Sequence, residues 1–345
     1  MELELKRDRL VLRARGNKWE WGIEPRYWRN PLIYVSLLVI FPILIYFVYP
    51  ALQATIIEAN LLAAIAIPLA LMSLGTGRMN FGPQFYIGVG GYTAALLSIH
   101  CGLSPGLTLI VAALVGLAFG FAMSPLSILS GGLYYTLLTL LFPLVFLEIT
   151  FIYTDIFKGD VGLFGVAPLV SGFSFTVNQL VFAFASLAMM LIYLYIIDKI
   201  LRSRYAVQMA AINDDEEVAN GIGINVNKIK VISFAIPAMM IAIIGWFYAH
   251  YYGTFAGITF LPLTFMLKIL MVIMIGGRIQ IYGNVIGGYF IAFLELLLIR
   301  TAGDMSPVLF PIILLVLLLT LREGLFGLYR KRHYREYMPT LHVRR

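Results

Sequence analysis

The stretch GRMNFGPQFYIGVGGYTAALL, residues 77–97, lies in a hydrophobic chain but is interrupted by glycines, a proline and polar residues. About 20 consecutive apolar residues are enough for a helix to cross a bilayer. Backbone groups that proline or glycine leaves free inside a membrane must be satisfied by protein or in a water-filled cavity. The stretch therefore predicts a helix that packs tightly against a neighbour or lines a pathway, and that does not face lipid all round.

The whole chain is too apolar for a soluble domain. Of its 345 residues, 61% are hydrophobic and 12% are charged, and the mean hydropathy is +0.89. Soluble domains are roughly 45–50% apolar and about 25% charged. We expect an all-α polytopic membrane protein with about ten transmembrane segments in the plasma or inner membrane of the cell. The candidate segments are 32–50, 52–75, 82–100, 105–123, 131–153, 178–197, 231–252, 260–276, 283–300 and 306–321.

The basic residues predict the orientation of these segments. If the N-terminus is cytoplasmic and the segments alternate in direction, 22 of the 25 Lys and Arg residues fall on the cytoplasmic side. This excess follows the positive-inside rule. It predicts that both termini are cytoplasmic, and it attributes the net charge of +7 to topology and lipid contact, with no nucleic-acid binding. Segment 82–100 either crosses fully or is re-entrant.

Three regions follow from this topology. Residues 1–31 form a charged cytoplasmic or interfacial extension, in which Trp19, Trp21 and Trp28 suit the headgroup level. Residues 32–321 form the transmembrane domain, with a long cytoplasmic loop at 198–230. Residues 322–345 form a basic cytoplasmic tail.

Several kinds of chemistry find no support in the sequence. Cys101 is the only cysteine, so no disulfide can form within the chain. The four histidines show no metal-ligand spacing, and we predict neither a metal site nor a catalytic group. No segment matches the phosphate-binding pattern G-x-x-x-x-G-K-[ST], so the chain has no recognisable ATP site of its own.

The cytoplasmic loop predicts one short helix. Asp214, followed three residues later by Glu217, resembles a capping box with Asp214 as the N-cap. The acidic run between them suits the positive end of a helix dipole. Gly221 or Gly223 can supply the left-handed residue that ends the helix. We expect about two turns, which serve either as an ordinary connection or as the element on which a separate motor subunit pushes.

The segment EVANGIG, Glu217–Gly223, resembles the E-A-A-x-x-x-G coupling motif of bacterial ABC import permeases, with Val218 in place of the first alanine. The run from Ala206 to Gly253 resembles the matching loop and span of branched-chain amino acid ABC transporter permeases of the LivM type. Three further stretches resemble that family in the same order, so the resemblance covers about residues 52–332. They are residues 77–97, residues 131–149 with 159–166, and residues 271–298 with 322–332.

The resemblance implies the transmembrane subunit of an ABC importer for branched-chain amino acids, or a related permease for urea or short amides. It implies that the chain is not an enzyme and that ATP and Mg²⁺ bind to two ATP-binding cassette subunits. The other implied partners are a homologous second permease, an extracytoplasmic substrate-binding protein and membrane lipid. The residues expected to couple the chain to the ATPase subunit are Asp214, Asp215, Glu216, Glu217, Ala219 and Gly223.

Four ionisable residues within the predicted spans need an explanation, because each costs about 2.5–3.5 kcal/mol at the membrane centre on translocon scales. Glu58, Glu148, Lys268 and Glu295 are expected in one layer, roughly 8–12 Å below the outer surface at 1.5 Å per residue. We expect Lys268 to pair with Glu148 or Glu295. These groups either shape an outer vestibule for a zwitterionic solute or form a purely structural ion pair.

A self-sufficient secondary carrier is the alternative function. Such a carrier needs ion or proton sites near the bilayer midplane, whereas the predicted charges lie away from it. Gly116 with Gly120 and Gly283 with Gly287 have the spacing of close helix contacts. Polar residues of the stretch 77–97 and three of the ionisable residues are the candidates for lining the solute pathway. They are Asn80, Gln84, Tyr92, Thr93, Glu148, Lys268 and Glu295.

Overall fold

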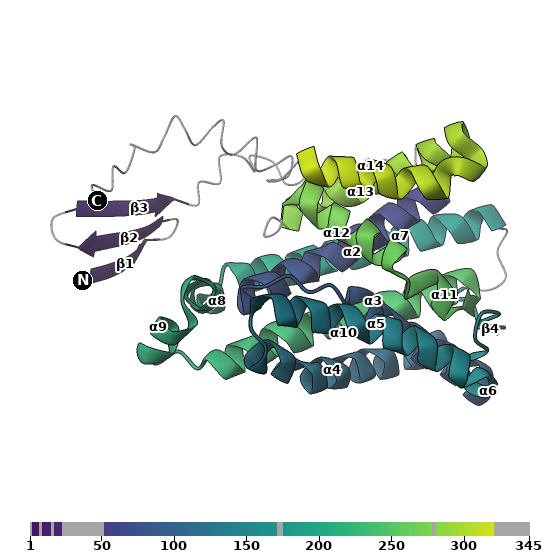
Figure 1. Cartoon of the computed structure of the whole chain (residues 1–345), viewed down its shortest axis with the longest axis horizontal. Helices are drawn as coiled ribbons and strands as arrows, with labels where there is room; N and C mark the ends of the chain where they lie inside the picture. Colours follow the sequence, from purple (N-terminus) through teal and green to yellow (C-terminus); the bar gives the residue numbers. More distant parts are fainter. Residues whose placement is uncertain are drawn as a thin grey trace.

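The computed structural model describes the backbone of residues 2–6, 9–14, 17–22, 52–170, 175–277 and 281–320. Long helices dominate this part of the chain and lie side by side in a bundle (Figure 1). The long helices are α2 (Gln53–Thr76), α3 (Pro83–Cys101), α4 (Pro105–Leu129), α5 (Gly132–Ile152), α7 (Phe175–Leu201), α10 (Val226–Tyr252), α12 (Leu263–Gly276), α13 (Ile281–Ala302) and α14 (Ser306–Thr320). The short helices are α6 (Thr154–Phe157), α8 (Arg204–Asp214), α9 (Glu216–Gly221), α11 (Gly257–Phe260) and the 3-10 turn η3 (Gly303–Met305).

The N-terminal extension contains a small sheet that the sequence analysis did not predict. Strands β1 (Glu2–Lys6), β2 (Arg9–Ala14) and β3 (Asn17–Gly22) pair antiparallel in the order β1-β2-β3. Trp19 and Trp21 belong to β3, whereas Trp28 lies outside the described residues. The alternation of charged and apolar residues in ELELK and KWEWG has the two-residue period of a strand. That signal was present in the sequence.

Seven stretches of the described chain are long and apolar enough to cross a membrane. Helices occupy all nine candidate segments from residue 52 onward, while segment 32–50 lies outside the described residues. Two reasons make the numbers differ: α3 is more polar than the seven, and residues 281–317 count as one stretch although η3 separates α13 from α14. The total of ten crossings and the cytoplasmic termini therefore stay predictions.

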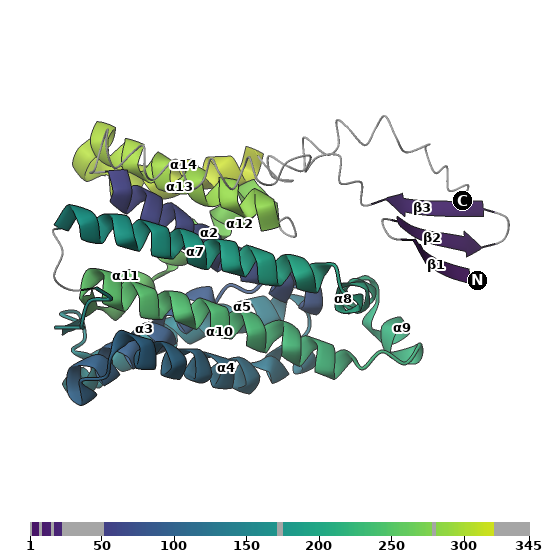
Figure 2. The same ribbon diagram turned by 180° about the vertical axis from the view of Figure 1, so that it is seen from behind.

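Helix α3 contains the stretch that opened the sequence analysis. It is one continuous helix of 19 residues, about 28 Å long at 1.5 Å per residue, and this favours a full crossing over a re-entrant segment. Pro83 is its first residue, where a missing N–H costs no helical hydrogen bond. Figures 1 and 2 show α3 beside α10 and α4, inside the bundle.

Close helix contacts depend on glycines in α3, α4 and α10. A Cβ at Gly90 would collide with the backbone of Ala242, and one at Gly245 would lie 2.8 Å from the backbone nitrogen of Gly91. A Cβ at Gly120 would lie 2.7 Å from the Cβ of Ala238. Only a residue without a side chain allows this approach. The prediction of tight packing within 77–97 is therefore confirmed.

The other predicted small-residue pairs also lie at helix contacts. Gly116 packs against Ala242 on α10, so α4 and α3 approach the same central helix. Gly283 and Gly287 of α13 meet the backbone of α12 at Gly276 and Val272. Helix α2 lies among α7, α10, α12 and α13, and nearly all its side chains are buried. The core of the bundle is therefore built around α2 and α10.

Candidate functional site

The loop predicted to be cytoplasmic folds into α8 and α9, and α9 lies at the left end of the bundle in Figure 1. The prediction that Asp214 caps the helix is wrong by one residue. Helix α8 continues through Asp214, and Asp215 then adopts an extended conformation. The Asp215 carboxylate accepts hydrogen bonds from the backbone N–H groups of Glu217 and Val218, both at 3.0 Å. The cap shifts because the preceding helix uses Asp214 as its own last residue.

The end of α9 follows the prediction. The helix has six residues, which is close to two turns. Gly223 has φ +90°, a conformation that favours glycine. The N–H of Ile224 donates to the carbonyl of Ala219 at 3.1 Å, which satisfies a carbonyl that the end of the helix leaves free.

The two faces of α9 differ. Ala219 is 1% exposed and lies on the buried face of the helix. Val218 and Ile222 are 60% and 70% exposed, although both are apolar, and Glu217 is exposed beside them. Val218 lies on α9, and Ile222 is the residue that caps its C-terminal end. An exposed apolar pair four residues apart is suited to insertion into a groove of another protein.

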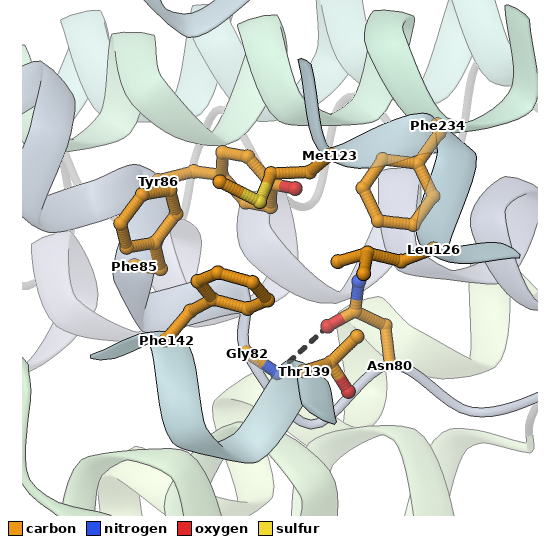
Figure 3. A pocket seen from close by; sticks show the side chains of 9 residues that line it. All are labelled: Asn80, Gly82, Phe85, Tyr86, Met123, Leu126, Thr139, Phe142 and Phe234. Atoms are coloured by element: carbon orange, nitrogen blue, oxygen red, sulfur yellow. Dashed lines mark hydrogen bonds between the residues drawn. The ribbon is translucent and has the colours of Figure 1, made fainter. Parts of the chain in front are cut away.

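Asn80 lies at the entrance to α3, in a small pocket between α3, α4, α5 and α10 (Figure 3). Its side-chain oxygen accepts from the N–H of Gly82 at 2.7 Å, and its amide lies 2.9 Å from the sulfur of Met72. Thr139 accepts from the N–H of Phe81 at 3.1 Å. Asn80 and Thr139 therefore hold the loop before α3. The lining residues are Asn80, Gly82, Phe85, Tyr86, Met123, Leu126, Thr139, Phe142 and Phe234.

The other three candidates on α3 have different environments. Gln84 is fully buried, and neither its oxygen nor its nitrogen has a hydrogen-bond partner in the described chain. Tyr92 is buried among aromatic rings, and its hydroxyl accepts from the N–H of Gly257 at 2.7 Å. Thr93 is partly buried. A buried amide without a hydrogen-bond partner lowers the stability of the fold by about 1–3 kcal/mol. Gln84 is therefore the candidate on α3 whose side chain has unused capacity to bind a ligand.

Lys268 forms the centre of an ion cluster between α2, α12 and α13. Its Nζ lies 2.7 Å from Glu295 and 3.6 Å from Glu58. The hydroxyl of Tyr248 on α10 donates to Glu58 at 3.1 Å. The prediction that Lys268 pairs with Glu295 is confirmed. The three charged side chains keep only 14–30% of their surface exposed, so the cluster also holds its helices together.

The alternative partner, Glu148, does not join this cluster. It is exposed on α5, on the same side of the helix as Val145 and Ile152, which are 54% and 71% exposed. Helix α5 contacts the bundle through one narrow face that includes Thr139 and Thr150, and Glu148 lies off that face. Of the two partners predicted for Lys268, the structure therefore shows Glu295 and not Glu148. The prediction that all four ionisable residues lie at one depth in the membrane stays a prediction.

Sequence reasoning missed two polar networks. At one end of α10, Thr108 lies 2.9 Å from the Nε2 of His250 and accepts from the indole N–H of Trp246 at 3.0 Å. At the opposite end, Lys230 is fully buried and binds Glu216 at 2.5 Å. Lys230 was counted only as a cytoplasmic charge, because its partner lies 14 residues away in another helix.

Comparisons with known proteins identify the family of the chain. Residues 51–321 match the family described as branched-chain amino acid transport system / permease component. The chain is 28% identical over 260 residues to the "Probable branched-chain amino acid transport permease protein LivH" of Methanocaldococcus jannaschii, covering 72% of this chain and 80% of that protein. No solved structure matches the chain. The comparisons do not single out the LivM type. The family match spans most of the described helical region, and the chain belongs to the family of permease components of branched-chain amino acid transport systems.

Proposed function

We propose that this permease is a transmembrane subunit of an ABC importer that moves branched-chain amino acids into the cell. The observation that carries the coupling part of the proposal is α9, a capped helix that projects from the bundle with Val218 and Ile222 exposed. A separate ATPase subunit would bind this surface, since the sequence contains no phosphate-binding loop. The LivM type stays a prediction.

The partners of the proposal are those that membership of this permease family suggests. Two cassette subunits would bind ATP and Mg²⁺, and an extracytoplasmic binding protein would deliver the solute. A homologous second permease would complete the membrane part in the plasma or inner membrane. Asp215, Glu217 and Gly223 would keep the shape and charge of α9 for the ATPase subunit, through the cap, the exposed carboxylate and the left-handed turn.

The solute pathway would pass α3. Gln84 supports this part of the proposal, because its buried amide is unpaired in the described chain and could bind the amino or carboxylate group of a solute. Asn80, Tyr92 and the Lys268 cluster already have partners, so we assign them to shaping the bundle near that pathway.

Reconstitution in proteoliposomes tests the proposal. The permease is combined with the cassette subunits, the second permease and the binding protein encoded beside it, and uptake of radiolabelled leucine is measured with and without ATP inside the vesicles. We expect uptake only with the complete set and ATP. Uptake by the permease alone would show a secondary carrier, and uptake of labelled urea without leucine would show a permease for short amides.

A further inference from the structure

The first residue of α9 points toward the bundle, unlike its neighbour. The carboxylate of Glu216 accepts from the Nζ of Lys230 at 2.5 Å and lies 3.9 Å from the guanidinium of Arg78. The Lys230 side chain is fully buried, whereas that of Glu216 is 40% exposed. Glu217 is exposed, and no ion pair of Glu217 occurs in the part of the chain that the structure describes.

Both cations also bind the end of α4. Lys230 donates to the carbonyl of Ser127 at 3.0 Å, and Arg78 donates to the carbonyls of Ser127 and Ser130. The last carbonyls of a helix have no partner inside it and carry the negative end of its dipole. One network therefore joins α9, the loop between α2 and α3, the end of α4 and the start of α10.

Helices α3, α4 and α10 are packed so closely that they will move together. Their contacts at Gly90, Gly120 and Gly245 leave no space for a Cβ. A close-packed interior of this kind transmits displacement instead of absorbing it. Helix α8 is attached elsewhere: its buried Met209 lies beside Gly75 of α2.

We propose that Glu216 is a positioning residue that transmits movement of α9 to the inner ends of α3, α4 and α10. This role rests on the proposed function, because it takes the ATPase subunit as the source of the movement. A carboxylate that is partly exposed and shared by two cations can loosen one contact while it keeps the other. Glu217 on the outer face would contact the ATPase subunit, and Glu216 on the inner face would contact the bundle.

Hydrogen exchange of the purified permease tests the attachment without any transport assay. We compare Glu216→Gln with Glu217→Gln, because both variants lose one negative charge from the first turn of α9. Amides of residues 216–224 should exchange about tenfold faster in Glu216→Gln than in Glu217→Gln, as expected when one hydrogen bond between charged groups is lost. Lys230→Gln should have the same effect, with little added in the double variant. Equal exchange rates in the two glutamate variants would overturn the ion pair of Glu216 with Lys230 as the attachment of α9. Exchange rates that rise additively when Glu216→Gln and Lys230→Gln are combined would overturn it as well.

The reconstituted transporter tests the transmission. In Glu216→Gln, ATP hydrolysis should continue while the number of leucine molecules taken up per ATP falls several-fold. An unchanged ratio, with normal uptake by the wild type, would overturn the role of Glu216 alone. A wild-type complex without ATP-driven uptake would overturn the proposed function, and this role with it.

Discussion

Replacing Gly120 by alanine tests the close packing of α4 on α10. The added Cβ would lie 2.7 Å from the Cβ of Ala238 and 2.8 Å from the Cα of Ala235. Carbon atoms pack best at about 3.5–4.0 Å, so the helices must separate by roughly 1 Å at this point. Overpacking of this kind costs about 1–3 kcal/mol, and the better helix propensity of alanine returns up to about 1 kcal/mol. We expect a net destabilisation of about 1–2 kcal/mol.

Gly106 provides a matched control in the same helix. It is exposed in the first turn of α4, and a Cβ there would meet nothing within 4 Å. Gly106→Ala should therefore leave stability unchanged or raise it by less than about 1 kcal/mol. The two variants carry the same chemical change and differ only in what the methyl group meets.

The assay is the thermal unfolding midpoint of each purified variant in detergent, read as the fraction that stays monodisperse on size-exclusion chromatography. Gly120→Ala should unfold several degrees below the wild type, and Gly106→Ala should not. If the two variants unfold at the same temperature, α4 and α10 are not in close contact at Gly120. The inference that α3, α4 and α10 move together would then be wrong.

Three further predictions concern the charged and polar groups. Lys268→Met should lower stability by about 2–3 kcal/mol, because it leaves the carboxylates of Glu58 and Glu295 without their cation in partial burial, and Lys268→Met with Glu295→Gln should recover part of the loss in unfolding midpoint. Asp215→Ala should cost about 1 kcal/mol within α9 through the lost cap, measured as faster exchange of the Glu217 and Val218 amides. Gln84→Leu should leave the unfolding midpoint unchanged or raise it, because it removes an unpaired buried amide, but should reduce leucine uptake; normal uptake would remove Gln84 from the pathway.

Glycine spacing allowed the sequence to predict several helix contacts. A pair such as Gly283 and Gly287 places two small residues on one side of a helix, so local sequence alone predicts that another helix packs closely there. Local sequence does not predict which helix that is. That Gly120 would meet Ala238, more than 100 residues later, depends on how the helices are arranged.

Helix α2 shows a second limit. Apart from a few polar residues such as Glu58, its sequence is apolar with almost no amphipathic pattern, which is equally compatible with a helix in lipid and a helix inside a bundle. The structure buries it and uses Asn60 to bind Ser186 and Tyr289 on two other helices. A single asparagine in an apolar run indicates that a partner is needed, but not where the partner lies.

The site was predicted best where its geometry is local. The turn at Gly223 and the length of α9 depend on a few adjacent residues, and both agree with the sequence analysis. The cap was misplaced by one residue because α8 was not predicted, and α8 ends at Asp214. The bridge between Glu216 and Lys230 joins different helices and could not be read from spacing.

The two ion clusters differ in the elements that hold them, and this assigns them different tasks. Glu58, Lys268 and Glu295 all lie on long helices packed into the bundle, so their ion pairs cannot separate unless α2, α12 or α13 moves. Glu216 lies on a helix of six residues that projects from the bundle, so its ion pairs can change with a small movement of α9 alone. Loss of the Lys268 cluster should therefore appear mainly as lost stability. Glu216→Gln keeps an amide oxygen that can accept from Lys230, and Lys230 also donates to the carbonyl of Ser127. Glu216→Gln should therefore appear mainly as ATP hydrolysis without transport, and unfolding as easy as that of Lys268→Met would contradict this distinction.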